Sequence, residues 1–305
     1  MSKAASSRMR SWAGRLIALA ACAALVVAGS FPLVGCSSIQ TNDEMDDTLT
    51  TTLDSSATIS AGVLTVGVNS SNTPYAGMNS SDELIGFDID VAAAIADELG
   101  LELNIVDVNS NGRSALANGQ VDVVLGVTKS GNDDTVTYSE AYLYDGPSLF
   151  MLADNAIESI DDFELGEDKV IVQAETNSAV SVQEALGIDN MDTTSTMQEA
   201  IDALEAGEQP YLVVDAALGS YFARSYDDIV RVDYISAEDV TPMYALTLTE
   251  NAELTEAVST ALSTITDNGV LRVVETKWLG AEAASLLPGA VDTSTLPETA
   301  FGVWS

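Results

Sequence analysis

Short apolar, β-rich runs alternate with amphipathic helical periods, and this alternation constrains the fold more than any other feature of the chain. The order is a strand over 63–68, a helix over 86–100, a strand over 103–108, a short helix over 113–118 and a buried strand over 121–125. Such alternation is typical of a parallel α/β sheet with right-handed crossovers, in which ligands bind beyond the carboxyl ends of the strands.

The same pattern restarts in the second half of the chain. It predicts a strand over 169–173, helices over 178–186 and 198–206, a buried strand over 211–214 and a long helix over 253–267. Within the first helix, Asp88 or Asp90 is placed to cap the amino end or to favour the helix dipole. We therefore expect an α/β protein with two similar halves.

The amino-terminal segment predicts export. Four basic residues without a neighbouring acid precede an apolar run over 16–27, and that run is too short and too interrupted for a permanent membrane span. The sequence Leu33-Val34-Gly35-Cys36 resembles the lipobox of bacterial lipoproteins. It predicts a signal peptide over 1–35, lipid on Cys36 and a flexible tether over 36–56; the alternative is cleavage at an ordinary site, with Cys36 left as a thiol.

Acidic residues dominate the composition. The formal net charge is −36, from 47 acidic and 11 basic residues, and four of the basic residues precede Cys36. Such a charge disfavours nucleic acid and anionic surfaces and favours cations. Its other explanation is solubility alone.

The chain also lacks several kinds of chemistry. It has no histidine and only two cysteines, which removes the usual zinc sites and the catalytic triads that depend on imidazole. No phosphate loop, dinucleotide fingerprint or twelve-residue calcium loop is present. We expect no cofactor, no metal and no catalytic residue.

Between residues 62 and 280 several motifs follow one another in a fixed order: Gly62-Val63-Leu64-Thr65-Val66-Gly67, Gly86-Phe87-Asp88-Ile89-Asp90, Val136-Thr137-Tyr138-Ser139-Glu140 and Lys277-Trp278-Leu279-Gly280. Their order and spacing resemble those of the bacterial extracellular solute-binding proteins that deliver polar amino acids to ABC transporters. The resemblance implies a two-lobed, type II periplasmic-binding-protein fold with two hinge crossings, near 146–152 and 240–246. It assigns 57–149 and 243–305 to the first lobe and 150–242 to the second.

The resemblance also implies ligand-binding residues. Tyr75 stands where the family places an aromatic lid, Arg113 where some members place an arginine, and Asp215 where a carboxylate holds the ligand's ammonium group. Each has a structural alternative: Tyr75 packed on its own lobe, Arg113 in a surface ion pair and Asp215 as a helix cap.

One departure from the family concerns the ligand's carboxylate. After Gly126-Val127-Thr128 the family usually has an arginine that grips the carboxylate, whereas this chain continues Lys129-Ser130-Gly131-Asn132-Asp133. Gly126, Thr128 and Lys129 remain in the predicted site, with Thr176 and Asn177 as donors from the second lobe. The predicted ligand is therefore an amino acid or a related amine-bearing small solute, and the missing arginine favours an amine or another cationic or zwitterionic solute over an ordinary α-amino acid.

The resemblance implies a lipid-anchored, monomeric binding protein at the cell surface or in the periplasm, working with an ABC permease and not with nucleic acid. Two alternatives remain: a surface receptor that presents ligand to a sensor, and an enzyme similar to cyclohexadienyl dehydratase. Phe301 and Trp304 either pack on the first lobe or belong to a loose tail.

Overall fold

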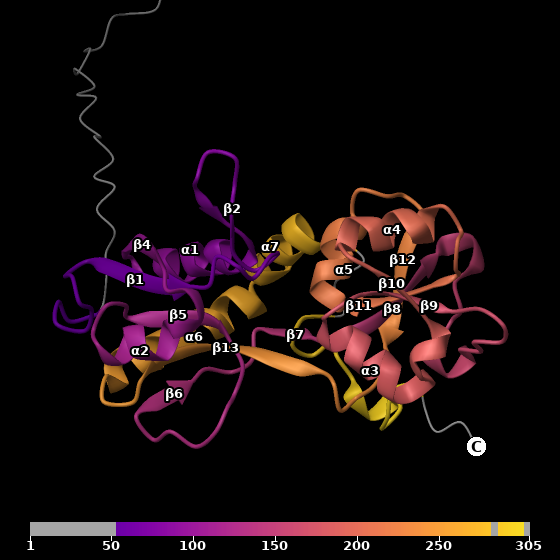
Figure 1. Cartoon of the computed structure of the whole chain (residues 1–305). Coiled ribbons are helices and arrows are strands. Elements are labelled where there is room, and N and C mark those ends of the chain that lie inside the picture. Colours follow the sequence, from indigo (N-terminus) through magenta and orange to yellow (C-terminus); the bar gives the residue numbers. More distant parts are fainter. Residues whose placement is uncertain (1–52, 282–285, 302–305) are drawn as a thin grey trace, which may run out of the picture. The chain divides into compact units, whose positions relative to one another are not determined.

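The computed structural model describes residues 53–281 and 286–301, which form two large sheets, each with helices around it, and one small hairpin (Figure 1). The first sheet has the order β4-β1-β5-β13-β6, with β7 also paired to β13. Its strands are β1 (Val63–Val68), β4 (Glu102–Asp107), β5 (Val123–Val127), β6 (Val136–Tyr138), β7 (Leu143–Asp145) and β13 (Thr241–Leu248). A small hairpin, β2 (Gly77–Met78) and β3 (Leu84–Ile85), stands beside it.

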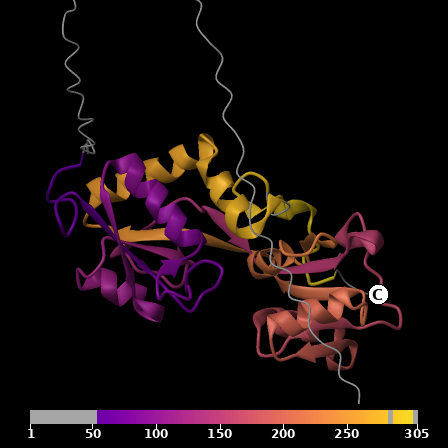
Figure 2. The same cartoon turned by 90° about the horizontal axis from the view of Figure 1, so that it is seen from above.

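The predicted parallel arrangement is correct for β1, β4 and β5, but the sheet is mixed. β13 runs antiparallel to β5, β6 and β7, because it enters from the far half of the chain rather than through a helical crossover. The helices of this lobe are α1 (Phe87–Leu99), α2 (Gly112–Ala117), α6 (Ala252–Asp267) and α7 (Val270–Leu279). Figures 1 and 2 both show α1 beside α6 and α7.

Helix α1 illustrates how the apolar pattern positions an element. Val91, Ala92 and Ile95 are buried in the hydrophobic core that α1 forms with α6, α7 and the first sheet, which we call the first core. Gly100 ends the helix in the left-handed conformation at φ 63°.

Of the two predicted roles of Asp88 and Asp90, capping is wrong, since Gly86 is the N-cap and no side chain caps the helix, whereas both acids lie in the first turn, where they favour the helix dipole. Both carboxylates also accept hydrogen bonds from residues distant in the sequence, Asp88 from Tyr142 and Asp90 from Trp278.

The second sheet has the order β10-β9-β11-β8-β12. Its strands are β8 (Pro147–Leu152), β9 (Val170–Gln173), β10 (Met191–Thr194), β11 (Tyr211–Asp215) and β12 (Ile229–Tyr234). Its helices are α3 (Asn177–Leu186), α4 (Met197–Glu205) and α5 (Ala216–Ala223). Short 3-10 turns η1, η2, η3, η4 and η6 lie at Asn109–Asn111, Ala153–Asn155, Ile160–Asp162, Ile188–Asn190 and Thr293–Thr295.

Two short connections join the sheets. The chain leaves β7 at Asp145 and enters β8 at Pro147, and it returns from β12 to β13 through residues 235–240. Both changes of sheet come a few residues before the predicted boundaries at 149/150 and 242/243. The first change of sheet falls at Gly146, where the crossing predicted near 146–152 begins, and the second ends at Val240, where the crossing predicted near 240–246 begins, since β13 pairs with β7 from Thr241.

The carboxyl-terminal segment adds a third connection. The carbonyl of Pro297 accepts a hydrogen bond from the N–H of Ala237 at 2.9 Å, and the N–H of Phe301 donates to the carbonyl of Ile235 at 2.9 Å. The Phe301 ring stacks on Phe163 in the second lobe, with centroids 4.3 Å apart. The prediction that residues up to 305 belong to the first lobe is thus wrong for Phe301, while Trp304 lies outside the described residues.

At the other end, the predicted tether is shorter than expected. Leu53 packs against the first core, the N–H of Asp54 donates to Glu253 at 2.8 Å, and the N–H of Ile59 donates to Asp122 at 2.8 Å. Residues 53–56 are therefore attached to the first lobe rather than free. The predicted signal peptide and Cys36 lie outside the described residues, and within the described ranges no helix combines the length and apolarity of a membrane span.

Candidate functional site

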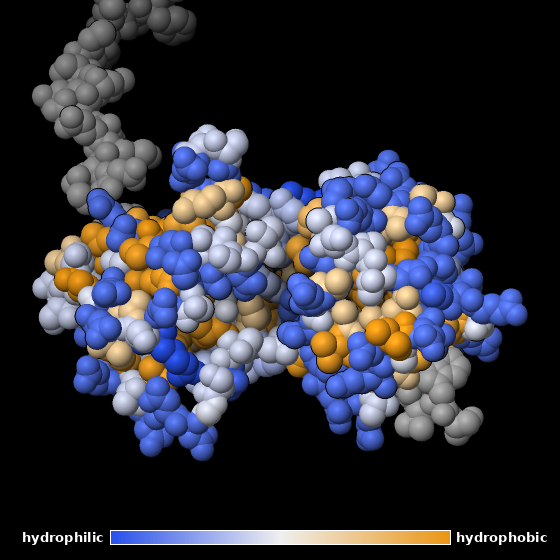
Figure 3. Space-filling view, viewed as in Figure 1, coloured by the Kyte–Doolittle hydropathy of each residue, from blue (hydrophilic) through white to orange (hydrophobic). Residues whose placement is uncertain are grey.

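A cavity of about 510 Å³ lies where the two sheets meet. Residues of the first lobe, the second lobe and both connections line it: Asn72, Tyr75, Gly126, Thr128, Asp145, Gly146, Pro147, Asn177, Val180, Ser181, Glu184, Asp215, Glu238, Asp239, Thr241 and Met243. We call this cavity the cleft. Figure 3 shows hydrophilic residues over much of this face of the molecule.

Two carboxylates stand at strand ends in the cleft. Asp215 ends β11, and its Oδ1 accepts a hydrogen bond from the Ser178 hydroxyl at 2.6 Å. Asp145 ends β7, and its Oδ1 accepts from the N–H groups of Gly146 at 2.9 Å and Ala217 at 3.0 Å. Removal from water raises the pKa of Asp215, and it raises the pKa of Asp145 to about 6 with a further contribution from Asp215. A cation between Asp145 and Asp215 would stabilise both ionised carboxylates and so lower both pKa values.

Tyr75 lies in the cleft wall beside Asp145. Its side chain is buried and its hydroxyl donates to Asp145 Oδ2, so the ring is fixed at the cleft wall. The structure thus brings Tyr75 and Asp215 to one cavity, as the resemblance implied. Asp215 is the N-cap residue of α5, but its carboxylate makes no capping bond and faces Ser178 instead.

Three more carboxylates line the cleft, those of Glu184 on α3 and of Glu238 and Asp239 on the second connection. With Asp145 and Asp215 they make five, and no lysine or arginine is among the described lining residues. Sequence reasoning identified only Asp215. Asp145 had a detectable signal, since it follows a short β-rich run and precedes a glycine, whereas the other three depend on how the connections and α3 are packed.

The two predicted cations lie outside the cleft lining. Arg113 donates to the carbonyl and hydroxyl of Ser130, each at 3.3 Å, and to the Tyr138 hydroxyl, and it forms an ion pair with Asp133 at 3.6 Å. The ammonium of Lys129 stands 4.4 Å from the ring centroid of Tyr244. Both cations are thus engaged within the first lobe by a carboxylate and by aromatic faces.

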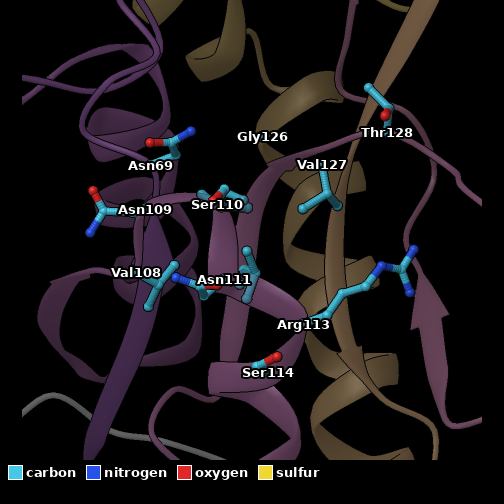
Figure 4. Close-up of a pocket in the computed structure, with 13 residues that line it drawn as sticks. Asn69, Val108, Asn109, Ser110, Asn111, Arg113, Ser114, Gly126, Val127 and Thr128 are labelled. Carbon is cyan, nitrogen blue, oxygen red and sulfur yellow. The ribbon is translucent and has the colours of Figure 1, made fainter.

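A second cavity of about 440 Å³ adjoins the cleft in the first lobe and shares Gly126 and Thr128 with it. Amide and hydroxyl side chains gather in it, including Asn69, Asn109 and Ser110 (Figure 4). In that view the side chain of Arg113 extends away from the asparagines, toward β6. Arg113 is the one charged residue among the described residues that line this cavity, which is otherwise polar and uncharged.

Gly126 lines both cavities, and a hydrogen bond to Tyr142 holds its backbone in place. Its N–H donates to the Tyr142 hydroxyl at 2.7 Å, and that hydroxyl donates to Asp88 at 2.7 Å. Gly126 has φ +70°, and a Cβ added there would lie 2.5 Å from Asp88 Oδ2. Sequence reasoning missed this role of Asp88, whose pKa burial raises to about 7. No local signal indicates it, because Tyr142 is 54 residues away.

Of the two hydrogen-bond donors predicted from the second lobe, Asn177 lines the cleft and Thr176 does not. Asn177 lines the cleft at the start of α3. Thr176 does not line it, since its hydroxyl caps α3 by accepting from the N–H of Ala179 at 3.1 Å and donating to the Gln173 carbonyl at 2.8 Å. Thr128 and Gly126 line both cavities.

Comparison with known proteins gives a consistent result. The sequence profile of the bacterial extracellular solute-binding proteins, family 3, matches residues 64–281. The arginine-binding extracellular protein ArtP of Bacillus subtilis is 26% identical over 227 residues, with 72% of this chain and 87% of ArtP covered. The glutamine-binding protein of Geobacillus stearothermophilus is 30% identical over 202 residues, with coverages of 61% and 76%.

Solved structures agree on the fold. An ancestral cationic amino acid solute binding protein (AncCDT-1) aligns with a TM-score of 0.60 and 27% identity, over 72% of this chain and 96% of its own. The L-cystine solute receptor of Neisseria gonorrhoeae aligns with a TM-score of 0.62 and 21% identity, over 73% and 94%. The predicted two-lobed type II fold is confirmed. Because the profile match covers most of the chain, this protein belongs to the bacterial extracellular solute-binding proteins of family 3.

Proposed function

We propose that this chain is the solute-binding component of an ABC importer and that it holds a small, amine-bearing solute in the cleft. The main support for the proposal is the lining of the cleft, which has carboxylates from both lobes and the second connection and no lysine or arginine among the described lining residues. The ammonium group of the solute would lie between Asp145 and Asp215, where charge-assisted hydrogen bonds are strong. Tyr75 would form the wall beside it.

The relatives support transport rather than catalysis. Several are named for the amino acids that they bind, among them arginine, glutamine and cystine. The dehydratase alternative needs cations to hold a cyclic acid, and Arg113 and Lys129 are engaged elsewhere. The receptor alternative shares the same cleft chemistry, and a permease that recognises the ligand-bound protein would distinguish the two roles.

Isothermal titration of the purified protein with L-arginine, L-lysine, 1,4-diaminobutane and L-glutamate tests the proposal. We expect heat of binding with at least one amine-bearing cation and none with L-glutamate. Asp215→Asn keeps the shape and the Ser178 contact but removes the charge, so it should weaken the binding of the preferred amine at least tenfold. A preference for L-glutamate, or silence with all four compounds, would contradict the proposal.

We propose further that the protein acts outside the cytoplasm as a monomer, anchored by lipid on Cys36. The basic and apolar segment before Cys36 and the lipobox-like sequence support this. Metabolic labelling with palmitate should label the natural chain but not Cys36→Ser. Equal labelling of both chains, or release of the natural chain as a soluble protein, would contradict the anchor.

A further inference from the structure

The charge balance of the cleft bears on which amine it selects, and this inference depends on the proposed function of the cleft as the ligand site. A zwitterionic amino acid brings one ammonium and one carboxylate, so it leaves the five carboxylates of the lining uncompensated. Its own carboxylate would add a sixth negative group, with no lysine or arginine in the described lining to receive it. The cleft therefore disfavours the zwitterion and favours a ligand with more than one positive charge.

The carboxylates are distributed along the cleft rather than gathered at one point. Ser178, which binds Asp215, lies in the first turn of α3, and Glu184 lies six residues further along the same helix. At about 1.5 Å per residue, these two positions are roughly 9 Å apart along the helix axis. Within the described residues, no three acidic side chains are grouped closely enough to hold a metal ion. The arrangement suits an extended organic cation.

Apolar side chains lie between the charged positions. Val180 lies between Asn177 and Glu184 on the cleft-facing side of α3 and is 54% exposed, and Met243 and Pro147 also line the cavity. Such side chains can cover the methylene groups of a ligand, as they cover the stems of long side chains in protein interiors. Together with the Tyr75 ring, they form a surface that suits a hydrocarbon chain.

We propose that the cleft selects an α,ω-diamine without a carboxylate, with one ammonium group at Asp145 and Asp215 and the other at the outer carboxylates, principally Glu184. The first group meets carboxylates that are already removed from water. The second meets an exposed carboxylate on α3. The methylene chain between them lies along Val180.

Matched ligands test this proposal by isothermal titration of the purified protein. L-Lysine and 1,5-diaminopentane differ only in the α-carboxylate, and 1-aminopentane lacks one ammonium group. We expect 1,5-diaminopentane to bind at least tenfold more tightly than either compound. Tighter binding of L-lysine would overturn the diamine inference and leave the proposed function standing, whereas no binding of any amine would remove both.

A pair of variants tests the second contact. Glu184→Gln should weaken the binding of 1,5-diaminopentane by about threefold to tenfold and leave the binding of 1-aminopentane unchanged. The control is Glu205→Gln, an exposed glutamate at the end of α4 that does not line the cleft. Equal effects of Glu184→Gln on both ligands, or no effect on either, would overturn the proposed position of the second ammonium group.

Discussion

Asp145 is the residue whose ionisation most directly controls the cleft. Its carboxylate faces Asp215, the Tyr75 hydroxyl and the N–H groups of Gly146 and Ala217, and Tyr234 lies close enough to interact with its charge. Removal from water and the charge of Asp215 raise its pKa to about 6. A bound ammonium would favour the ionised form, so binding should release protons near that pH.

We therefore expect the affinity for an amine to fall as the pH decreases through 6, by up to about tenfold per unit. Below pH 6 the ligand must displace a proton from Asp145, whereas above pH 7 the carboxylate is already ionised. Titrations at pH 5, 6, 7 and 8 measure this. Asp145→Asn should bind more weakly at pH 7 and show a flatter profile, and a natural protein whose affinity is constant from pH 5 to 8 would contradict the role.

The burial of Glu275 leads us to predict that the free energy of unfolding also depends on pH. Its side chain is fully buried in α7, and burial raises its pKa to about 8 despite Arg272, Arg231 and the N–H of Leu286. Because the folded protein holds the proton more tightly than the unfolded chain, this group favours folding below its ordinary pKa of 4.5. That contribution decreases as the pH rises from 4.5 toward 8.

Thermal unfolding between pH 4.5 and 9 should show this loss as a falling component of the melting temperature. Glu275→Gln should reduce the fall, since the amide does not ionise, while the exposed Glu256→Gln should leave it unchanged. Identical pH profiles for the natural protein and Glu275→Gln would show that Glu275 does not titrate in this way.

At the level of elements, local pattern predicted those strands and helices whose apolar residues face a single core. Strand β1 and helices α1, α3, α4 and α6 lie within one or two residues of the predicted ranges. What the pattern could not predict were contacts between elements distant in sequence. Asp90 accepts a hydrogen bond from the Trp278 indole at 2.6 Å, 188 residues away, and no feature near Asp90 indicates that partner.

The same limit applies to the cleft. Asp215 was predictable because a resemblance assigned it, and the buried strand before it marks a sheet edge. Glu238 and Asp239 belong to a connection whose path depends on Gly146, where an added Cβ would lie 2.6 Å from the Asp239 carbonyl oxygen. Their arrival at the cleft follows from that close approach, which is a property of the folded chain and not of the connection's own sequence.

Helix α5 packs against β8 through Gly219. A Cβ at this position would lie 2.4 Å from the buried Phe150 ring and 2.6 Å from Val214 Cγ1. Alanine would gain about 1 kcal/mol of helix propensity over glycine. We expect overpacking, which typically costs about 1–3 kcal/mol, to outweigh that gain in Gly219→Ala.

Urea denaturation of Gly219→Ala measures the net effect as a lower midpoint. A second substitution, Phe150→Leu, makes room for the added methyl group, so the double variant should lose less than the sum of the two single losses. Additive losses would show that the ring and the added methyl group do not interact.

At the scale of the whole molecule, the segment over 297–301 packs against the second lobe and pairs with the second connection. The Phe301 ring is 6% exposed and stacks on Phe163, and its backbone pairs with Ile235 in the second connection. Phe301→Ala should therefore destabilise the protein by about 3 kcal/mol, as buried phenylalanine truncations commonly do. Ile188→Ala, at a residue 66% exposed in the same lobe, provides the matched control and should change little.

Chemical denaturation of both variants measures the difference. A loss for Phe301→Ala no larger than that for Ile188→Ala would mean that the segment does not contribute to the stability of the second lobe.

The path of this segment has a practical consequence. Leu53 packs on the core of the first lobe and Phe301 on that of the second, so the two ends of the described residues are attached to different lobes. A donor fluorophore joined at one end and an acceptor at the other would each move with its own lobe. Energy transfer between them would report any change in the distance between the lobes when a solute binds, and such a change would let the protein serve as a genetically encoded sensor for its solute without any insertion into the fold.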